Sequence, residues 1–168
     1  MDSADHGADP NLRTQRLGAY AVVVHDDALL LTRISASGFP AGWWALPGGG
    51  VDHGESPHVA GERELFEETG MRARSRRLVD VHDVHVVDLG RGDRYEDFHG
   101  VHLLYAVDVD TSVEPRVVEK HGTTDLVRWV PLAELPPQAP DAAPGPLLPV
   151  VGYVLDHLDQ FKGAPSAP

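Results

Sequence analysis

The spacing of apolar and polar residues along the chain predicts several strands and two helices. Aliphatic residues fill 17–25 and 29–34, and Asp26–Asp27 between them is typical of a tight turn, so this pair predicts a β-hairpin. Further strands are expected where short apolar or alternating runs recur: 43–46, 76–89, 99–109 and 126–130. The amphipathic run Val150–Phe161 predicts a helix near the end of the chain.

The helix expected over Pro57–Thr69 is marked by signals at its ends. Ser56 is a favoured N-cap, and proline is tolerated at the first helical position. Gly70 suits the left-handed position that commonly follows a last helical turn. Gly48–Gly50, just upstream, is expected to form a Gly-rich turn. Strands with inserted helices predict an α+β or α/β sandwich.

Length and composition indicate one domain with short tails. The chain has 168 residues, of which 42% are hydrophobic, which is enough for a core. We expect a flexible tail over 1–14, a domain over 15–161 and a second tail over 162–168. The formal net charge of −12 argues against binding nucleic acid or an anionic membrane through a broad basic face. A polyanionic substrate would therefore need help, for which a divalent cation is the usual choice.

The absence of cysteine excludes disulfides, thiolate zinc sites and a cysteine nucleophile. No apolar run approaches about 18 residues, so no membrane-spanning helix is expected. The N-terminus lacks a basic segment followed by an apolar one, so it does not resemble a signal peptide. The sequence therefore predicts a cytoplasmic protein.

Three carboxylates are expected on one face of the helix over 57–69. At about 100° per residue, Glu64, Glu67 and Glu68 fall within a sector of about 100°. Like charges at this spacing repel, so a cation should offset them, and hard oxygen ligands suit Mg²⁺ or Mn²⁺. An ordinary solvated acidic helix face is the alternative.

Other residues around this face have predicted roles as well. Ala60 and Gly61 leave room for the Gly-rich turn, which could offer a backbone carbonyl to a metal ion. Arg63 can fix a carboxylate by two hydrogen bonds, and Glu55 could share it. The opposite side should pack through apolar residues: Val59, Leu65 and Phe66.

The segment from Gly49 to Met71 has a specific pattern: glycine, five residues, Glu55, seven residues, Arg63-Glu64-Leu65, one residue, Glu67-Glu68, one residue, Gly70-Met71. This resembles the Nudix box of the Nudix hydrolase superfamily (MutT-like) at every defining position. The flanking runs 44–49 and 129–135 also resemble the family, so the likeness spans about residues 17–160.

The resemblance implies an α+β fold, an α/β/α sandwich with a mixed β-sheet and a loop-helix-loop metal site. It implies Mg²⁺ (or Mn²⁺) as cofactor, with these ligands: Gly48 through its carbonyl, Glu64, Glu67 and Glu68. Arg63, paired with Glu55, would orient the glutamates. The implied reaction is hydrolysis of a nucleoside diphosphate linked to another moiety, by attack of water at phosphorus. The expected partner is a small diphosphate-containing substrate, not nucleic acid or a membrane, and a homodimer is left open.

Three questions stay open at this stage. The general base could be Glu67, Glu68 or Glu119, which lies ahead of the strand at 126–130. The substrate could be a nucleoside triphosphate or a nucleotide sugar, and Arg33 could meet a phosphate. The alternative function is a non-catalytic module that senses a nucleotide metabolite. Isopentenyl diphosphate isomerases share the fold but use a cysteine, which this chain lacks.

Overall fold

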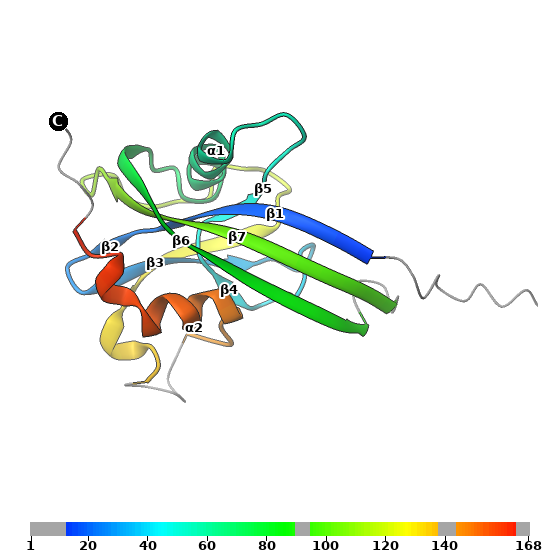
Figure 1. Ribbon diagram of the computed structural model, residues 1–168. Helices are drawn as coiled ribbons and strands as arrows, with labels where there is room; N and C mark the ends of the chain where they lie inside the picture. The colour runs from blue at the N-terminus through cyan, green and yellow to red at the C-terminus, as the bar shows by residue number, and fades with distance from the viewer. Residues whose placement is uncertain (1–12, 90–94, 138–143, 164–168) are drawn as a thin grey trace, which may run out of the picture.

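Two four-stranded sheets and two α-helices make up the part of the chain that the computed structural model describes, residues 13–89, 95–137 and 144–163 (Figure 1). The first sheet has the strand order β5 (Gly48–Gly50), β1 (Arg13–Val22), β7 (Tyr95–Val109), β6 (Ala73–Leu89). It is mixed, because β1 and β7 run parallel whereas the other neighbours are antiparallel. The second sheet is antiparallel and contains β2 (Val24–His25), β3 (Ala28–Ile34), β4 (Trp44–Ala45) and β8 (Thr124–Pro131).

The chain passes from the first sheet to the second at Val23, between β1 and β2. The Val23 carbonyl accepts a hydrogen bond from the Leu30 N–H at 3.0 Å, which continues the pairing with β3. Asp26 and Asp27 have φ values of 46° and 55°, the left-handed conformation that a two-residue hairpin turn requires. The predicted hairpin is therefore confirmed.

The two helices lie on opposite sides of the sheets (Figure 1). Helix α1 (Pro57–Thr69) packs against β1 and β5, and α2 (Pro149–Asp156) packs against β4 and β6. A short 3-10 turn follows the strands at Leu132–Glu134, and another follows α2 at Leu158–Gln160. The expected fold class, α+β with a mixed sheet and helices on both sides, is confirmed.

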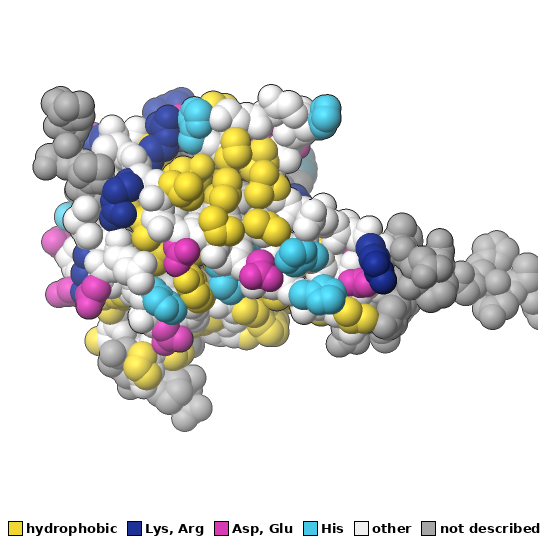
Figure 2. Space-filling view, viewed as in Figure 1, with side chains coloured by type: hydrophobic (Ala, Val, Ile, Leu, Met, Phe, Trp, Pro, Cys, Tyr) yellow, Lys and Arg dark blue, Asp and Glu magenta, His cyan; other side chains and the backbone are white. Residues whose placement is uncertain are grey.

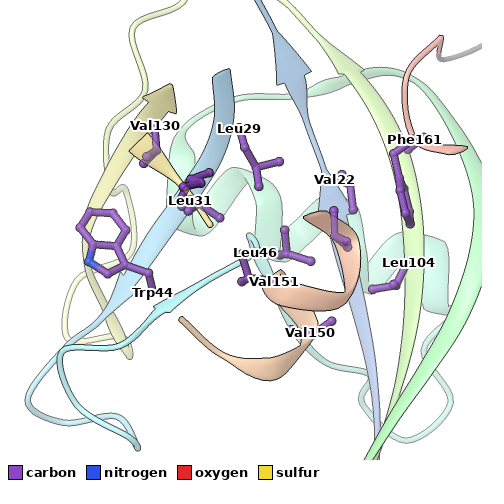
Figure 3. Packing of buried hydrophobic residues seen from close by; sticks show 13 residues of the cluster. Val22, Leu29, Leu31, Trp44, Leu46, Leu104, Val130, Val150, Val151 and Phe161 are labelled. Carbon is purple, nitrogen blue, oxygen red and sulfur yellow. The ribbon is translucent and has the colours of Figure 1, made fainter. Parts of the chain in front are cut away.

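Two apolar layers fill the space on either side of β1. Val22 belongs to the layer that α2 covers, whereas its neighbours Ala21 and Val23 belong to the layer under α1, because successive strand side chains point to opposite faces. In the first layer, Leu29 and Leu31 face Val150 and Val151 of α2 (Figure 3). In the second, Leu65 of α1 packs with Met71 and Leu30. Each fully buried aliphatic side chain contributes about 1.5–3 kcal/mol, so these layers fix where α1 sits.

Helix α1 begins and ends where the sequence predicts. Gly70 has φ 70° and donates its N–H to the Phe66 carbonyl at 2.8 Å, which closes the last turn. Ser56 occupies the N-cap position, but its hydroxyl bonds to His58 Nδ1 at 2.8 Å and does not cap the helix. The predicted C-terminal helix is shorter than expected: α2 ends at Asp156, although Phe161 is buried beyond the following turn.

Several predicted boundaries differ from the structure. Strand β1 begins at Arg13, inside the tail predicted for 1–14, because its first residues pair in register with β7. Residues 1–12 and 164–168 of the predicted tails lie outside the described residues, as do 90–94 and 138–143. Strand β7 begins at Tyr95, before the strand predicted for 99–109.

The prediction that Gly48–Gly50 is a turn is wrong. The three residues form strand β5, antiparallel to β1, with Gly18 opposite Gly50 and Tyr20 opposite Gly48. Gly61 faces β1, since a Cβ added to it would lie 3.5 Å from the Ala19 Cβ. The small residues of α1, Ala60 and Gly61, therefore allow β1 as well as the glycine segment to pack close to the helix.

Exposed apolar side chains gather on the α1 side of the first sheet, beside the helix (Figure 2). They include Leu17 at 39% exposed, Val59 at 46%, Leu78 at 50% and Val81 at 51%. The predicted packing role of Val59 is thus wrong, because α1 contacts the sheet through its other side. No helix among the described residues is long and apolar enough to cross a membrane.

Candidate functional site

Glu68 is a buried carboxylate near the C-terminal end of α1. Only 6% of the residue is exposed. Its Oε2 accepts the Gly48 N–H at 2.9 Å, and its Oε1 accepts the Thr124 hydroxyl at 2.5 Å. Burial raises the pKa of Glu68 to about 7, and the two hydrogen bonds offset only part of that effect. Both bonded donors are neutral, so Glu68 would gain from a cation.

Arg63 organises the other carboxylates of the helix. Its Nε and Nη2 donate to the two oxygens of Glu55 at 3.0 Å each. Its Nη1 donates to Glu64 at 2.8 Å and to Glu67 at 3.2 Å. The hydrogen bonds from Arg63 hold the pKa of Glu55 below its usual value. The expected pairing of Arg63 with Glu55 is therefore present, and the same guanidinium reaches two of the three helix glutamates.

The glycines of β5 allow this strand to lie close to both β1 and α1. Gly48 has φ 148°, and a Cβ there would lie 2.4 Å from the Ala19 carbonyl oxygen. A Cβ on Gly49 would lie 2.6 Å from the Glu64 Cδ, inside contact distance. Burial, first among several effects, raises the pKa of Glu64. A larger residue at Gly48 would push β5 away from β1, and one at Gly49 would push it away from α1.

Glu119 lies at the same end of α1. The N–H groups of Val118 and Glu119 both donate to the Glu67 carbonyl oxygen at 2.9 Å. The charge of Glu119 is one of the smaller effects that raise the pKa values of Glu64 and Glu68, and its carboxylate lies against Gly122. The structure thus brings together all the side chains that the sequence analysis singled out: Glu55, Arg63, Glu64, Glu67, Glu68 and Glu119.

The donor set fits a hard divalent cation. Several carboxylates share the single guanidinium of Arg63, and hard carboxylate oxygens are what Mg²⁺ or Mn²⁺ prefers. Among the described residues, no three acidic or histidine side chains stand ready to hold an ion. Oxygens of Glu64 and Glu67 already accept hydrogen bonds from Arg63. The two oxygens of Glu68 accept them from the Gly48 N–H and the Thr124 hydroxyl. An ion would therefore compete with Arg63 for the helix glutamates.

Some residues differ from expectation or were not anticipated. Arg33, for which a phosphate contact was left open, donates from Nε and Nη2 to Asp125 at 2.9 and 3.2 Å. The sequence analysis missed Thr124, which the chain brings to Glu68 from β8. Its only signal in the sequence is its position two residues before the predicted strand at 126–130. The Gly48 N–H was missed too, because only its carbonyl was considered.

Comparison with known proteins agrees with this geometry. The model of the NUDIX domain family matches residues 14–149. An RNA pyrophosphohydrolase of Brucella ovis is 33% identical over 103 residues, which cover 55% of this chain and 57% of the relative. The chain thus spans little more than half the length of the curated relatives it matches.

Solved structures show the same fold. A MutT NUDIX hydrolase from Burkholderia pseudomallei is 28% identical with a TM-score of 0.60, covering 86% of this chain and 98% of that one. The NUDIX domain of Shewanella oneidensis NrtR, solved with ADP ribose, is 21% identical with a TM-score of 0.58, covering 95% and 98%. Because the family model matches most of the described chain and the box residues converge in space, the chain belongs to the NUDIX domain family.

Proposed function

We propose that the protein hydrolyses a nucleoside diphosphate linked to another moiety, using Mg²⁺ or Mn²⁺. The observation that carries this proposal is the convergence of Glu55, Glu64 and Glu67 on one guanidinium, with the buried carboxylate of Glu68 beside them against a strand of three glycines. Such a surplus of negative charge is unfavourable unless a cation joins it, and a phosphate chain could not approach it without one.

Glu64, Glu67, Glu68 and the Gly48 carbonyl would hold the ion. A bound divalent ion neutralises phosphate oxygens and acidifies a water molecule. Arg63 keeps Glu55, Glu64 and Glu67 in place, and the Gly48 N–H and Thr124 fix the Glu68 side chain. These contacts position the carboxylates before substrate arrives, which reduces the reorganisation that the reaction requires.

We propose Glu67 or Glu119 as the general base. Glu67 is more exposed than Glu64, at 33% against 18%, and is joined to Glu119 through the backbone contact of its carbonyl. A carboxylate that accepts a proton from water must be reachable by water, which disfavours Glu68. The test is Glu119→Gln at saturating metal, because Glu119 is not among the proposed metal ligands. A large fall in kcat would assign the base to Glu119, whereas an unchanged kcat would leave the role to Glu67.

The proposed substrate classes are nucleoside triphosphates and nucleotide sugars. The test is a panel of both classes incubated with Mg²⁺, with phosphate release scored after addition of a phosphatase and EDTA as the control. We expect metal-dependent cleavage of at least one class. Binding of a nucleotide without cleavage would overturn the enzyme assignment and support the sensing module instead.

An RNA with a 5′-triphosphate is a second candidate, favoured by the names of the curated relatives. It carries the same phosphoanhydride chemistry, but the net charge of −12 opposes a long polyanion. We propose that only its terminal phosphates would be recognised. Adding a 5′-triphosphorylated oligonucleotide to the panel decides between a small nucleotide and an RNA end.

We propose further that a second copy of the chain covers the exposed apolar face beside α1. Strand β6 lies at the edge of the first sheet in the described part of the chain. Four side chains of β6 follow one another on the face that α1 covers: Arg76, Leu78, Val81 and Asp83. Each lies opposite a residue of β7 in the same order: Val107, Tyr105, Leu103 and Val101. This order is positive, apolar, apolar, negative.

A twofold axis between Leu78 and Val81 would place Arg76 of each copy near Asp83 of the other, as an isologous interface requires. Within one copy Arg76 pairs with Glu62 and Asp83 with His99. The measurement is molar mass by light scattering, expected at twice 18.2 kDa. Asp83→Arg should give the monomer, and adding Arg76→Asp should restore the dimer. A wild-type monomer at every concentration would contradict the proposal.

A further inference from the structure

Strand β8 begins with a β-bulge beside the carboxylate site. Strands β3 and β8 pair residue by residue as far as Arg33, which is opposite Leu126, but the next pair is Ile34 with Thr124. Asp125 is therefore an extra residue on β8, with no residue of β3 opposite it in the register. Because side chains alternate between the two faces of a sheet, a shift of one residue sends the side chains beyond it to the other face.

The bulge turns Thr124 toward α1. Leu30 belongs to the apolar layer under α1, so Ile34, four residues further along β3, points to the same side. Thr124 is opposite Ile34 and shares this side, where its hydroxyl donates to Glu68 Oε1 at 2.5 Å. In a regular ladder Asp125 would stand opposite Ile34. Thr124 would then point to the other face, away from Glu68.

The extra residue of the bulge is held by a forked ion pair. Arg33 donates from Nε and Nη2 to the two carboxylate oxygens of Asp125, at 2.9 and 3.2 Å. Two such bonds fix the orientation of a carboxylate as well as its distance. On the other side of Thr124, the Ser35 N–H donates to the Thr123 carbonyl at 2.7 Å. The end of β3 and the residue after it therefore hold β8 on both sides of Thr124.

We propose that Arg33 is a positioning residue: its ion pair with Asp125 stabilises the bulge, and the bulge holds the Thr124 hydroxyl on the metal-binding carboxylate of Glu68. The inference rests on the proposed function. It gives Arg33 no direct contact with a phosphate, since Nε and Nη2 already bind Asp125. An exposed ion pair contributes little to global stability, whereas a misplacement of about 1 Å at a reacting site can cost about a hundredfold in rate. Loss of activity without loss of stability is therefore the expected signature.

The test compares Arg33→Gln, Asp125→Asn and the double variant with the wild type. Arg128→Gln is the matched control, because Arg128 pairs with Glu134 at 2.9 Å at the other end of β8. The side chains of the control pair are 46% and 45% exposed, close to the 40% and 41% of Arg33 and Asp125. Steady-state kinetics with a nucleoside triphosphate give kcat and KM. Melting curves in EDTA and in saturating Mg²⁺, without substrate, give stability and the metal-induced rise in Tm.

We expect Arg33→Gln and Asp125→Asn each to lower kcat about tenfold or more, with little change in KM and a smaller rise in Tm on adding Mg²⁺. The double variant should be no worse than either single one, since one substitution already breaks the pair. Arg128→Gln should match the wild type, and Tm in EDTA should change little in any variant. A raised KM in Arg33→Gln alone, with kcat unchanged, would overturn the proposal and make Arg33 a phosphate ligand. Wild-type kcat and an undiminished rise in Tm in both single variants would overturn it too.

A second set of variants tests whether Arg33 acts through Thr124. Thr124→Val removes the hydroxyl and should lower kcat at least as much as Arg33→Gln, whereas Thr124→Ser should retain most of the activity. Adding Arg33→Gln to Thr124→Val should cause no further fall in kcat, and a full additional loss would overturn the proposal. If the wild type cleaves nothing, the proposed function fails. The Mg²⁺-induced rise in Tm of Arg33→Gln and Asp125→Asn, compared with that of the wild type, then still decides the role of Arg33, and no rise in the wild type would overturn that role as well.

Discussion

Arg63 and Glu55 are joined by two parallel hydrogen bonds of 3.0 Å, from Nε and Nη2 to the two carboxylate oxygens. Glu55 lies just before α1 and Arg63 in its second turn, so the pair ties the loop to the helix. The third nitrogen remains free to reach Glu64 and Glu67. One planar group therefore sets the position of three carboxylates, which a point charge cannot do.

The first prediction concerns this geometry. Arg63→Lys keeps the charge but loses the planar fork, so the carboxylates should lose their fixed arrangement. We expect kcat to fall by about tenfold or more while the protein still folds, because charged hydrogen bonds of this kind contribute roughly 1.5–3 kcal/mol. The measurement is steady-state kinetics with circular dichroism on the same samples. An active Arg63→Lys enzyme with wild-type kcat would show that charge alone is sufficient.

The second prediction separates the glutamates of α1. Glu64→Gln and Glu68→Gln should each lower kcat by about two decades, because a metal ligand that stabilises the transition state affects kcat more than KM. Glu62→Gln is the control, since Glu62 pairs with Arg76 on the exposed side of the helix and stands outside the cluster. Near-normal kcat in both site variants, or an equal loss in Glu62→Gln, would mean that the wrong helix face has been assigned.

The third prediction concerns stability with and without metal. An ion that binds only the folded protein stabilises it by about 2.7 kcal/mol at a hundredfold excess over Kd. For a domain of this size this corresponds to a rise of about 5–10 °C in Tm. Glu68→Gln should melt no lower than the wild type in EDTA, since it removes a buried negative charge, and should gain less on adding Mg²⁺.

Four melting curves check this prediction: wild type and Glu68→Gln, each with EDTA and with saturating Mg²⁺ at constant ionic strength. Equal metal-induced shifts in the two proteins would place the ion elsewhere. Weak binding would reduce the size of the shift but would preserve its direction and its order between the two proteins.

The sequence predicts the local parts of this site and misses the long-range ones. Both ends of helix α1 are predicted correctly, because Pro57 and Gly70 determine the conformation of the backbone next to them. The strand at Gly48–Gly50 is missed because glycines carry no apolar alternation, and only pairing with β1 makes them a strand. Thr124 meets Glu68 across 56 positions of the chain, a contact that no local pattern encodes.

Arg33 illustrates the same limit. The sequence leaves a phosphate contact open for it, and only the pairing of β3 with β8 brings Asp125 to its guanidinium.

The last prediction concerns a histidine pair on the α2 side of the first sheet. His82 and His102 are opposite each other in β6 and β7, with their Nδ1 atoms 3.3 Å apart and their rings stacked. Burial, and next the neighbouring His82, lower the pKa of His102 from 6.5 to about 4. His102 is therefore neutral in the folded protein at pH values where it would be protonated in the unfolded chain.

The direction of the effect follows from proton binding. Between pH 6.5 and about 4 the unfolded chain binds a proton at His102 that the folded protein does not, so acid favours unfolding. This stabilisation is fully present above pH 6.5 and is lost as the pH falls toward 4. Glu68, whose pKa is raised, acts in the opposite direction, because the folded protein binds its proton more readily. The wild-type curve alone therefore mixes the two effects.

Comparing wild type with His102→Gln isolates the histidine. Urea unfolding is measured for both proteins in EDTA at pH 7.5, 6.0 and 5.0, so that Glu68 contributes equally to each. We expect the free energy of unfolding of the wild type, relative to the variant, to decrease at each step down in pH, because glutamine cannot take up a proton. Chemical shifts of the His102 ring should show no protonation in the folded protein above pH 5. A difference in stability that does not change with pH would show that His102 titrates alike in the folded and unfolded chains.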